Sequence, residues 1–205
     1  MRLENGDVLF SWPLDAHVVT AGWTYNSGKA HNAIDLRAAV GTPVYAAEDG
    51  VVDWTQDWDG RTRTGMMSYG TGVRIRHADY CGGVLQTRYA HLSRRCVKTG
   101  ETVKEGHLIG CSGDSGNCYG AHLHFEVIWR GVRRNPLAWL DGDFACKDST
   151  VEANLGTYTS VVRPAVPAID WDCDRFIITA TGADKARLRA MVEELSLPCE
   201  SLKGA

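Results

Sequence analysis

The sequence predicts a mainly β protein, an antiparallel, barrel-like sandwich followed by a small α+β appendage. Between about residues 17 and 130, the 205-residue chain is a succession of short segments rich in Val, Ile, Tyr and Thr, separated by closely spaced glycines. No long helical period occurs there, whereas the pattern changes after Asn135 and Pro136. With 44% apolar and 23% charged residues, the chain has the composition of a folded globular protein.

The predicted strands follow one another at short intervals. They cover residues 43–46, 50–54, 73–77, 85–91, 108–111 and 122–129. Two segments echo each other weakly, GTPVYAAEDGVV from Gly41 and GETVKEGHLIG from Gly100, and each places a valine just beyond a glycine turn. Strands with hairpin edges of this kind are typical of a barrel-like antiparallel architecture.

The chain divides into three predicted regions. Residues 1–146 form the main domain, 147–172 form a linker rich in Pro, Ser and Thr, and 173–205 form a small β-α-β appendage. A strand is expected over residues 175–181, and a helix that ends at Pro198 follows it. The apolar face of that helix consists of Leu188, Met191, Val192 and Leu195. Core packing accounts for such a stripe, and no function follows from it.

The charge and hydropathy patterns exclude two classes of partner. The formal net charge of -3, with both signs interspersed, provides no broad basic surface for nucleic acid. No apolar run approaches the roughly 20 residues that span a bilayer, so we expect no membrane insertion. The first residues, MRLENGDVLFSWPL, lack the basic and apolar pattern of a secretory signal peptide.

The seven cysteines contain no Cys-x-x-Cys pair, which argues against a structural zinc knuckle. Short disulfide-closed loops are possible between Cys111 and Cys118 and between Cys81 and Cys96. We favour free thiols of a reducing compartment, because pairing geometry cannot be derived from spacing.

Two histidines share one face of a predicted strand. In the segment AHLHFEV, apolar and polar side chains alternate along the strand. The apolar set is Ala121, Leu123, Phe125 and Val127, and the polar set is His122, His124 and Glu126. The Cα atoms of His122 and His124 would lie roughly 6.5 Å apart. One imidazole can then bind a metal while its neighbour reaches a substrate atom beside that metal. An isolated His-x-His on a solvent-facing sheet surface is the plainer alternative.

The segment HNAID adds a second pair of metal-binding side chains. His31 and Asp35 would lie about 13 Å apart along a straight strand. They can reach one ion only if the chain bends between them, and the nearby Gly28 and Asn32 favour a bend. Imidazole and carboxylate suit zinc, and with His124 they make three protein ligands for one Zn²⁺ ion. A catalytic zinc keeps its fourth position for water, whose pKa falls to about 7.

Proton transfer requires a further group, and His91 in RYAHLS joins His122 as a candidate. One histidine can deprotonate the water while the other stabilises the oxyanion of the tetrahedral intermediate. The sequence does not assign these two roles. The helical His-Glu-x-x-His motif is absent, so no glutamate stands out as the base.

These motifs together resemble the LytM and lysostaphin-type zinc endopeptidases. HNAID, RYAHLS and GAHLHFEV occur in the family's order, flanked by GTPVYAAEDGVV and KEGHLIGCSGDSGNCYG, and the resemblance covers roughly residues 10–141. It implies an antiparallel β fold with a groove across the sheet. It also implies that His31, Asp35 and His124 bind zinc and that the catalytic histidines are His91 and His122.

The resemblance further implies the activity, which is zinc-dependent hydrolysis of peptide cross-links or stems in bacterial peptidoglycan. Tyr25 resembles a family position that assists the oxyanion, and packing is the alternative role for this aromatic ring. The enzyme would act at the cell wall, as a phage-released or virion-associated lysin or as a mature secreted form. The alternatives are a non-catalytic LytM-like module that binds the wall or activates a hydrolase, and a metallopeptidase of ordinary proteins.

The other histidines and one cysteine receive weaker interpretations. His17, His77 and His107 have no partner at ligand spacing, so ordinary hydrogen bonding is expected. Cys118, in the loop GDSGNCYG, departs from the family by placing a thiol near His122. We regard it as a less favoured metal ligand, because the set of three is complete without it.

Overall fold

The computed structural model of the chain describes residues 8–140, 145–146, 170–172 and 175–177. The chain forms two units, Met1–Val161 and Val162–Ala205. The first unit contains the predicted site.

The first unit is built on an eleven-stranded sheet. Its strands are β1 (Val18–Ala21), β2 (Ile34–Arg37), β3 (Pro43–Tyr45), β4 (Gly50–Gln56), β5 (Thr71–Arg76), β6 (Leu85–Arg95), β7 (Thr102–Val103), β8 (Leu108–Ser112), β9 (His122–Trp129), β10 (Val132–Arg134) and β11 (Ala145–Cys146). Two short 3-10 helices, η1 (Gly65–Tyr69) and η2 (Pro136–Ala138), complete the described elements of this unit. Each of the six predicted strands is present.

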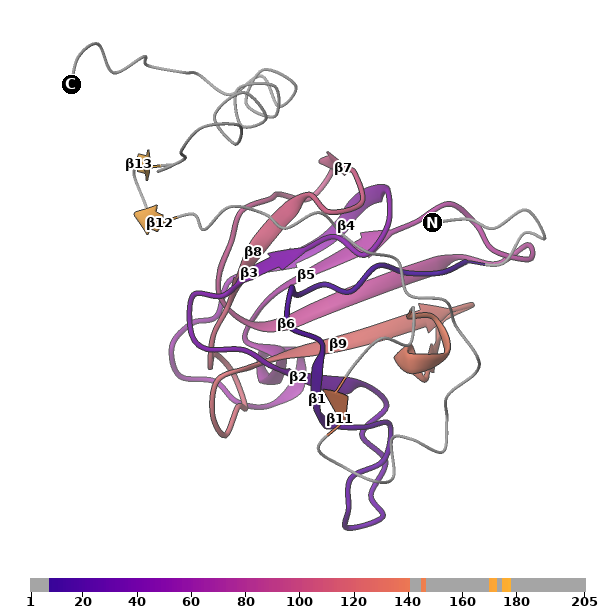
Figure 1. Cartoon of the computed structure of the whole chain (residues 1–205), viewed down its shortest axis with the longest axis horizontal. Helices are drawn as coiled ribbons and strands as arrows, with labels where there is room; N and C mark the ends of the chain where they lie inside the picture. Colours follow the sequence, from indigo (N-terminus) through magenta and orange to yellow (C-terminus); the bar gives the residue numbers. More distant parts are fainter. Residues whose placement is uncertain (1–7, 141–144, 147–169, 173–174, 178–205) are drawn as a thin grey trace. The chain divides into compact units, whose positions relative to one another are not determined.

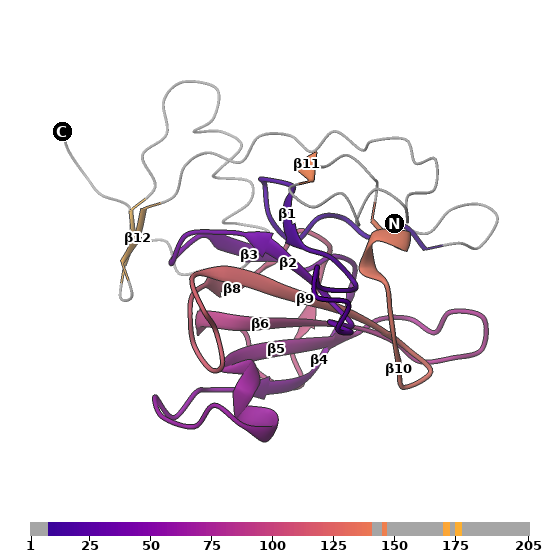
Figure 2. The ribbon, with the colours of Figure 1, turned by 90° about the horizontal axis from the view of Figure 1, so that it is seen from below.

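The strand order is β11-β1-β2-β9-β6-β5-β4-β7, and β3 pairs with β8 beside this path. Every pairing is antiparallel except that of β1 with β11. Strands β9, β6, β5 and β4 lie side by side in Figure 2. The predicted mainly antiparallel β fold is therefore confirmed.

Strand β6 changes its partner in the middle, and Figure 1 shows it between β9 and β5. Residues 85–90 pair with β9, whereas the pairing with β8 begins at Leu92. Between the two ladders stands His91, whose φ of 59° is in the left-handed region. Residues other than glycine rarely adopt this backbone conformation unless the surrounding structure enforces it. His91, a predicted catalytic residue, is thus the residue at which β6 changes from one partner strand to the other.

Strand β9 separates a hydrophobic core from the predicted site. Leu123, Phe125 and Val127 are fully buried in the core, as their alternation predicts. The N-terminal segment contributes Phe10 and Trp12 to the same core. The opposite face of β9 therefore carries the polar side chains of the strand, on a backbone that the core holds in place.

In the second unit, β12 (Asp170–Asp172) and β13 (Arg175–Ile177) form an antiparallel pair. Strand β13 lies within the strand expected over 175–181, and β12 lies within the segment expected to be a linker. The predicted helix lies outside the described residues, and the boundaries of the three regions remain a prediction. Among the described residues, no helix has the length and apolar character needed to cross a membrane.

Candidate metal centre

The bend expected between His31 and Asp35 is present. Asn32 has a left-handed φ of 61°, and the backbone N–H groups of His31 and Asn32 both donate to the carbonyl of Trp23. The chain enters β2 only at Ile34, so His31 stands before the strand and Asp35 within it. Asparagine tolerates this conformation better than most residues, which explains why the turn forms here.

The pairing of β2 with β9 brings the third residue to this position. Asp35 lies directly opposite His124 in the antiparallel ladder. Asp35 Oδ1 lies 3.1 Å from His124 Nδ1 and 3.2 Å from His31 Nε2, and the two imidazole nitrogens are 3.2 Å apart. Three potential ligand atoms, one from each predicted residue, therefore form a nearly equilateral triangle.

This triangle fits a zinc ion. Tetrahedral bonds of about 2.0–2.1 Å place neighbouring ligand atoms roughly 3.4 Å apart, close to the separations found here. His31 Nδ1 lies 2.8 Å from the carbonyl of Gly22, and His124 Nε2 lies 3.4 Å from the Glu126 carboxylate. These contacts engage His31 Nδ1 and His124 Nε2, and they leave His31 Nε2 and His124 Nδ1 for the metal.

The charge state of the triangle also suits a cation. Burial opposes ionisation of Asp35, but hydrogen bonds from His124 and His31 outweigh it and hold the pKa of this carboxyl well below its usual range. Burial acts to lower the pKa of His124, yet its contacts with Asp35 and Glu126 raise that pKa overall. A proton and a metal ion therefore compete for His124.

Glu126 is the residue that the sequence analysis missed. Arg88 and Arg133 donate to its carboxylate at 2.8 Å each, and the Tyr69 hydroxyl donates at 3.0 Å. Burial opposes its charge, but His124 and the two arginines lower the pKa of Glu126 to about 2. The carboxylate thus stays ionised while it holds His124. Its place on the same face of the strand as the two histidines was the signal that could have identified it.

His91 and His122 lie side by side next to the triangle. Their ring centroids are 4.9 Å apart, and the ring of His91 lies 5.5 Å from that of His124. His122 Nε2 is 3.5 Å from Asp35 Oδ1. All five residues predicted for metal binding and catalysis therefore come together.

His91 is held as a neutral imidazole. Its Nδ1 lies 2.8 Å from the backbone carbonyl of Ser115. Burial and, after it, the neighbouring His124 lower the pKa of His91 to about 4. Near neutral pH its Nε2 can therefore accept a proton or bind an electrophile.

Tyr25 lies against His31, one of the predicted metal ligands. Its ring stacks on His31, with the centroids 4.3 Å apart and the planes inclined by 26°. Burial and the nearby Asp35 carboxylate raise the pKa of Tyr25. The side chain is 41% exposed, so it stands at the mouth of the site, and its predicted role toward the oxyanion remains a prediction.

The remaining histidines and cysteines outside the site make ordinary contacts. His77 contacts the carbonyl of Asp49 and the hydroxyl of Thr87, each at 2.8 Å, and His17 stacks on Trp12. Cys81, Cys96, Cys111 and Cys118 are free cysteines, and none of these four forms a disulfide. The Cys111–Cys118 and Cys81–Cys96 loops are therefore not closed by disulfides in this structure.

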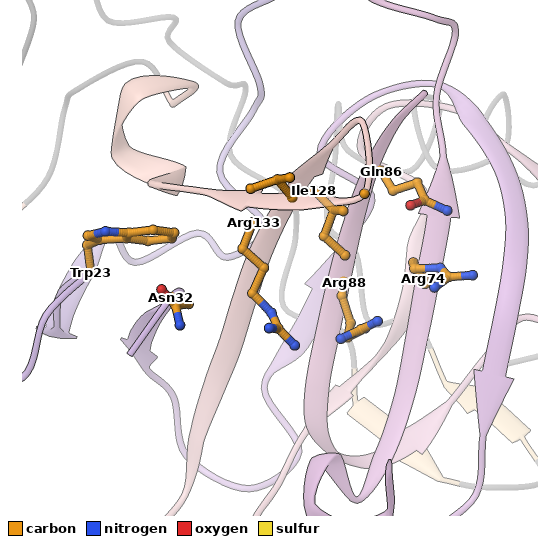
Figure 3. A pocket seen from close by; sticks show the side chains of 9 residues that line it. Trp23, Asn32, Arg74, Gln86, Arg88, Ile128 and Arg133 are labelled. Carbon is orange, nitrogen blue, oxygen red and sulfur yellow. The ribbon is translucent and has the colours of Figure 1, made fainter. Parts of the chain in front are cut away.

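A cavity of about 590 Å³ adjoins the turn that carries Asn32. Figure 3 shows that Arg133 and Arg88 extend toward the same region of this cavity, with Arg74 to one side and Trp23 on the other. Arg88 is buried, and its Nε has no hydrogen-bond partner among the residues that the structure describes. A buried donor of this kind favours an anionic or carbonyl-rich ligand.

An antiparallel β fold with a His-Asp-His triangle beside two further histidines is the arrangement of a metallopeptidase. Residues 29–136 match the family described as Peptidase family M23, and the chain belongs to this family. M23 peptidases are generally metallopeptidases. The predicted resemblance is thereby confirmed.

Individual relatives agree with the family. The chain is 43% identical over 112 residues to the peptidoglycan DD-endopeptidase ShyC of Vibrio cholerae, a match that covers 53% of this chain and 22% of that protein. A zinc-containing peptidase from Vibrio cholerae has a similar structure, with a TM-score of 0.53 and 29% identity over 65% of this chain and 44% of that one. For the catalytic domain of the prophage-encoded M23 protein EnpA from Enterococcus faecalis, the TM-score is 0.50 and the identity 33%, over 60% and 90% of the chains.

Proposed function

We propose that this chain is a zinc-dependent endopeptidase that hydrolyses peptide cross-links or stems of bacterial peptidoglycan. The observation that carries the proposal is the triangle of His31, Asp35 and His124, whose three ligand atoms lie 3.1–3.2 Å apart beside two histidines that need not bind the metal. The names of relatives such as ShyC support peptidoglycan as the substrate. The matched part spans only about a fifth of ShyC, so substrate and activity are proposed for this chain alone.

The proposed mechanism divides the work among five side chains. His31, Asp35 and His124 hold the zinc ion. Zinc bound there would act as a Lewis acid toward the peptide carbonyl and lower the pKa of a water molecule to about 7. His91, neutral and buried, accepts a proton, and His122 reaches the reacting carbonyl from the more exposed side of the site.

The arginine-lined cavity offers hydrogen-bond donors to a peptide substrate. Arg74 and Arg88 lie on neighbouring strands, and Arg133 lies on β10. Arg74 already donates to Asp53, and Arg88 and Arg133 donate to Glu126. Their remaining N–H groups can donate to the carbonyl or carboxylate oxygens of a peptidoglycan stem. We propose that the stem peptide lies in this cavity while its scissile bond reaches the metal.

The alternative is a non-catalytic LytM-like module that binds wall peptide or activates a hydrolase. Such modules typically lack some of the metal ligands, whereas every expected side chain is present here. A peptidase of ordinary proteins is the other alternative, and the names of relatives such as ShyC favour the wall.

Product analysis separates these functions. Purified peptidoglycans with glycine bridges or with direct D-alanyl cross-links, and casein as a control, are incubated with the zinc-loaded chain. We expect new amino termini from a peptidoglycan, identified by mass spectrometry, and an intact casein. Casein cleavage with undigested walls would contradict the wall substrate. The absence of any cleavage by a zinc-bound chain would favour the non-catalytic module.

A further inference from the structure

A second group of metal-binding side chains lies beside the first triangle. His91, Cys118 and His122 each offer one ligand atom, and these three atoms lie within 4.8 Å of one another. Cys118 Sγ is 3.4 Å from His122 Nδ1. The proposed catalytic mechanism uses the two histidines but has no role for the thiol.

The local chain geometry explains how the thiol reaches the histidines. Cys118 and His122 are separated by a turn at Gly120, whose φ is 126°. The carbonyl of Gly120 accepts the Cys118 thiol hydrogen at 2.9 Å and lies 2.8 Å from His122 Nδ1. The side chains of Cys118 and His122 therefore converge on one point, and the ring of His91 closes the group from β6.

The distances suit a thiophilic divalent ion. Zinc bonds of about 2.3 Å to sulfur and 2.0–2.1 Å to nitrogen place the two ligand atoms roughly 3.5 Å apart in tetrahedral geometry. The observed separation between Cys118 Sγ and His122 Nδ1 is 3.4 Å. His91 Nδ1 contacts the Ser115 carbonyl, so His91 Nε2 remains for the ion. A sulfur and two imidazole nitrogens form a softer set than the His-Asp-His triangle.

We propose that His91, Cys118 and His122 form a second, inhibitory binding site for zinc and similar thiophilic cations. This inference rests on the proposed function, because it assigns a regulatory role to the same catalytic histidines. An ion at the second site binds His91 Nε2, the nitrogen that would otherwise accept a proton, and holds the ring of His122 through its Nδ1. Hydrolysis stops while the first zinc remains bound.

Binding at the second site requires a proton to leave. The Cys118 thiol gives its hydrogen to solvent, its sulfur forms a bond to the ion, and its hydrogen bond to Gly120 is lost. His122 binds the ion through Nδ1, so its ring carries the hydrogen on Nε2 and gives up the 2.8 Å contact between Nδ1 and the Gly120 carbonyl. The ligand atoms of the first site already lie 3.1–3.2 Å apart, whereas the second site must first give up its contacts with the Gly120 carbonyl. The first site therefore fills at low metal concentration and the second only when metal is in excess.

Cobalt(II) titration of the metal-depleted full-length chain, under reducing and anaerobic conditions, tests the site without an activity assay. The first equivalent binds only nitrogen and oxygen and produces visible ligand-field bands alone. The second is expected to produce a near-ultraviolet thiolate-to-cobalt charge-transfer band. Cys118→Ser should lose this band and keep the first transition, whereas Cys81→Ser, a control at an exposed thiol, should retain both.

A charge-transfer band that persists in Cys118→Ser, or its absence from the unmodified chain, would overturn the proposal. If Cys118→Ser lost the first transition as well, Cys118→Ala would replace it as the test variant. A Cys118 variant that still binds the first equivalent of cobalt has kept its fold.

Inhibition by zinc provides the functional readout. Excess zinc should suppress peptidoglycan hydrolysis by the unmodified chain, and Cys118→Ser should raise the inhibitory concentration at least about tenfold, because one of three ligands is removed. Equal inhibition of both forms contradicts the proposal. If neither form hydrolysed peptidoglycan, the proposed function would fail, while the cobalt titration would still decide whether the second site exists.

Discussion

At the scale of single residues, the proposed site divides its histidines into two that would bind metal and two that would handle protons. His31 and His124 point ring nitrogens at Asp35, whereas the ring of His91 meets that of His122 edge to face. Substitutions in the two groups should therefore differ in their effects on zinc content and on hydrolysis.

Substitution by alanine separates the two groups. His31→Ala, Asp35→Ala and His124→Ala are expected to lose both zinc and peptidoglycan hydrolysis, because each removes one of three ligands. His91→Ala and His122→Ala should retain one zinc per chain and lose hydrolysis by about 100-fold or more. Metal analysis by mass spectrometry and amino-group release provide the two readouts. Loss of zinc from His122→Ala would show that His122 binds the metal, which contradicts the roles proposed for His122 and His124.

Glu126 should act on metal binding through His124. Glu126→Gln removes the charge that orients the second nitrogen of His124, so we expect zinc affinity to fall by about 10- to 100-fold. Competition with a chromogenic chelator measures the change. Glu101→Gln, on the loop before β7, is a matched control that should leave the affinity unchanged. Equal affinities in all three proteins would rule out this role.

At the scale of secondary-structure elements, buried charges join β6, β9 and β10. Glu126 on β9 is paired with Arg88 on β6 and with Arg133 on β10, and its side chain is only 2% exposed. Removal of one partner would leave a buried charge uncompensated. This ion cluster holds the ladder on which His124 stands.

The ion cluster predicts how stability depends on pH. In the folded chain the pKa of Glu126 is about 2, below its ordinary value of 4.5, so its contribution to stability is present above about pH 4.5 and is lost as the pH falls toward 2. The loss should be on the order of 3 kcal/mol. Urea unfolding of the metal-free chain between about pH 5 and 2.5 measures it. Glu126→Gln should show a weaker dependence, and parallel curves would contradict the assignment.

The region where β6 changes its partner allows no additional bulk. A Cβ atom on Gly113 would lie 2.5 Å from the backbone nitrogen of Ser93, and the carbonyl of Gly113 accepts the backbone N–H of His122. Gly113→Ala should lower the free energy of unfolding by about 1–3 kcal/mol and reduce hydrolysis, since the backbone must shift beside His122.

Gly60 provides the matched control for that substitution. A Cβ there meets open space, so Gly60→Ala should cost about 1 kcal/mol from its positive φ alone and leave hydrolysis unchanged. Equal effects of the two substitutions, in unfolding and in activity, would argue against a tightly packed junction at β6.

At the scale of the whole molecule, the sequence predicts those structural features that depend on neighbouring residues and on periodic patterns. Strict alternation in AHLHFEV placed two histidines on one face of β9, and Asn32 in HNAID indicated the bend that the structure shows. Residues 122–129 were predicted with the bounds that the strand has.

Contacts that depend on distant pairing could not be derived in the same way. His91 reaches the site because β6 exchanges β9 for β8 at that residue, and no spacing within RYAHLS indicates such an exchange. The arginines that surround Glu126 come from two other strands. The position of Cys118 depends on a turn at Gly120, which the sequence suggests only as a glycine.

The central claim is that this chain uses zinc to hydrolyse peptidoglycan. The most direct measurement is amino-group release from purified peptidoglycan by the full-length chain, followed through removal of zinc by a chelator and addition of one equivalent of zinc. Release should stop with the chelator and return with zinc. A chain that holds zinc but releases no amino groups, or one that continues to release them after zinc removal, would contradict the claim.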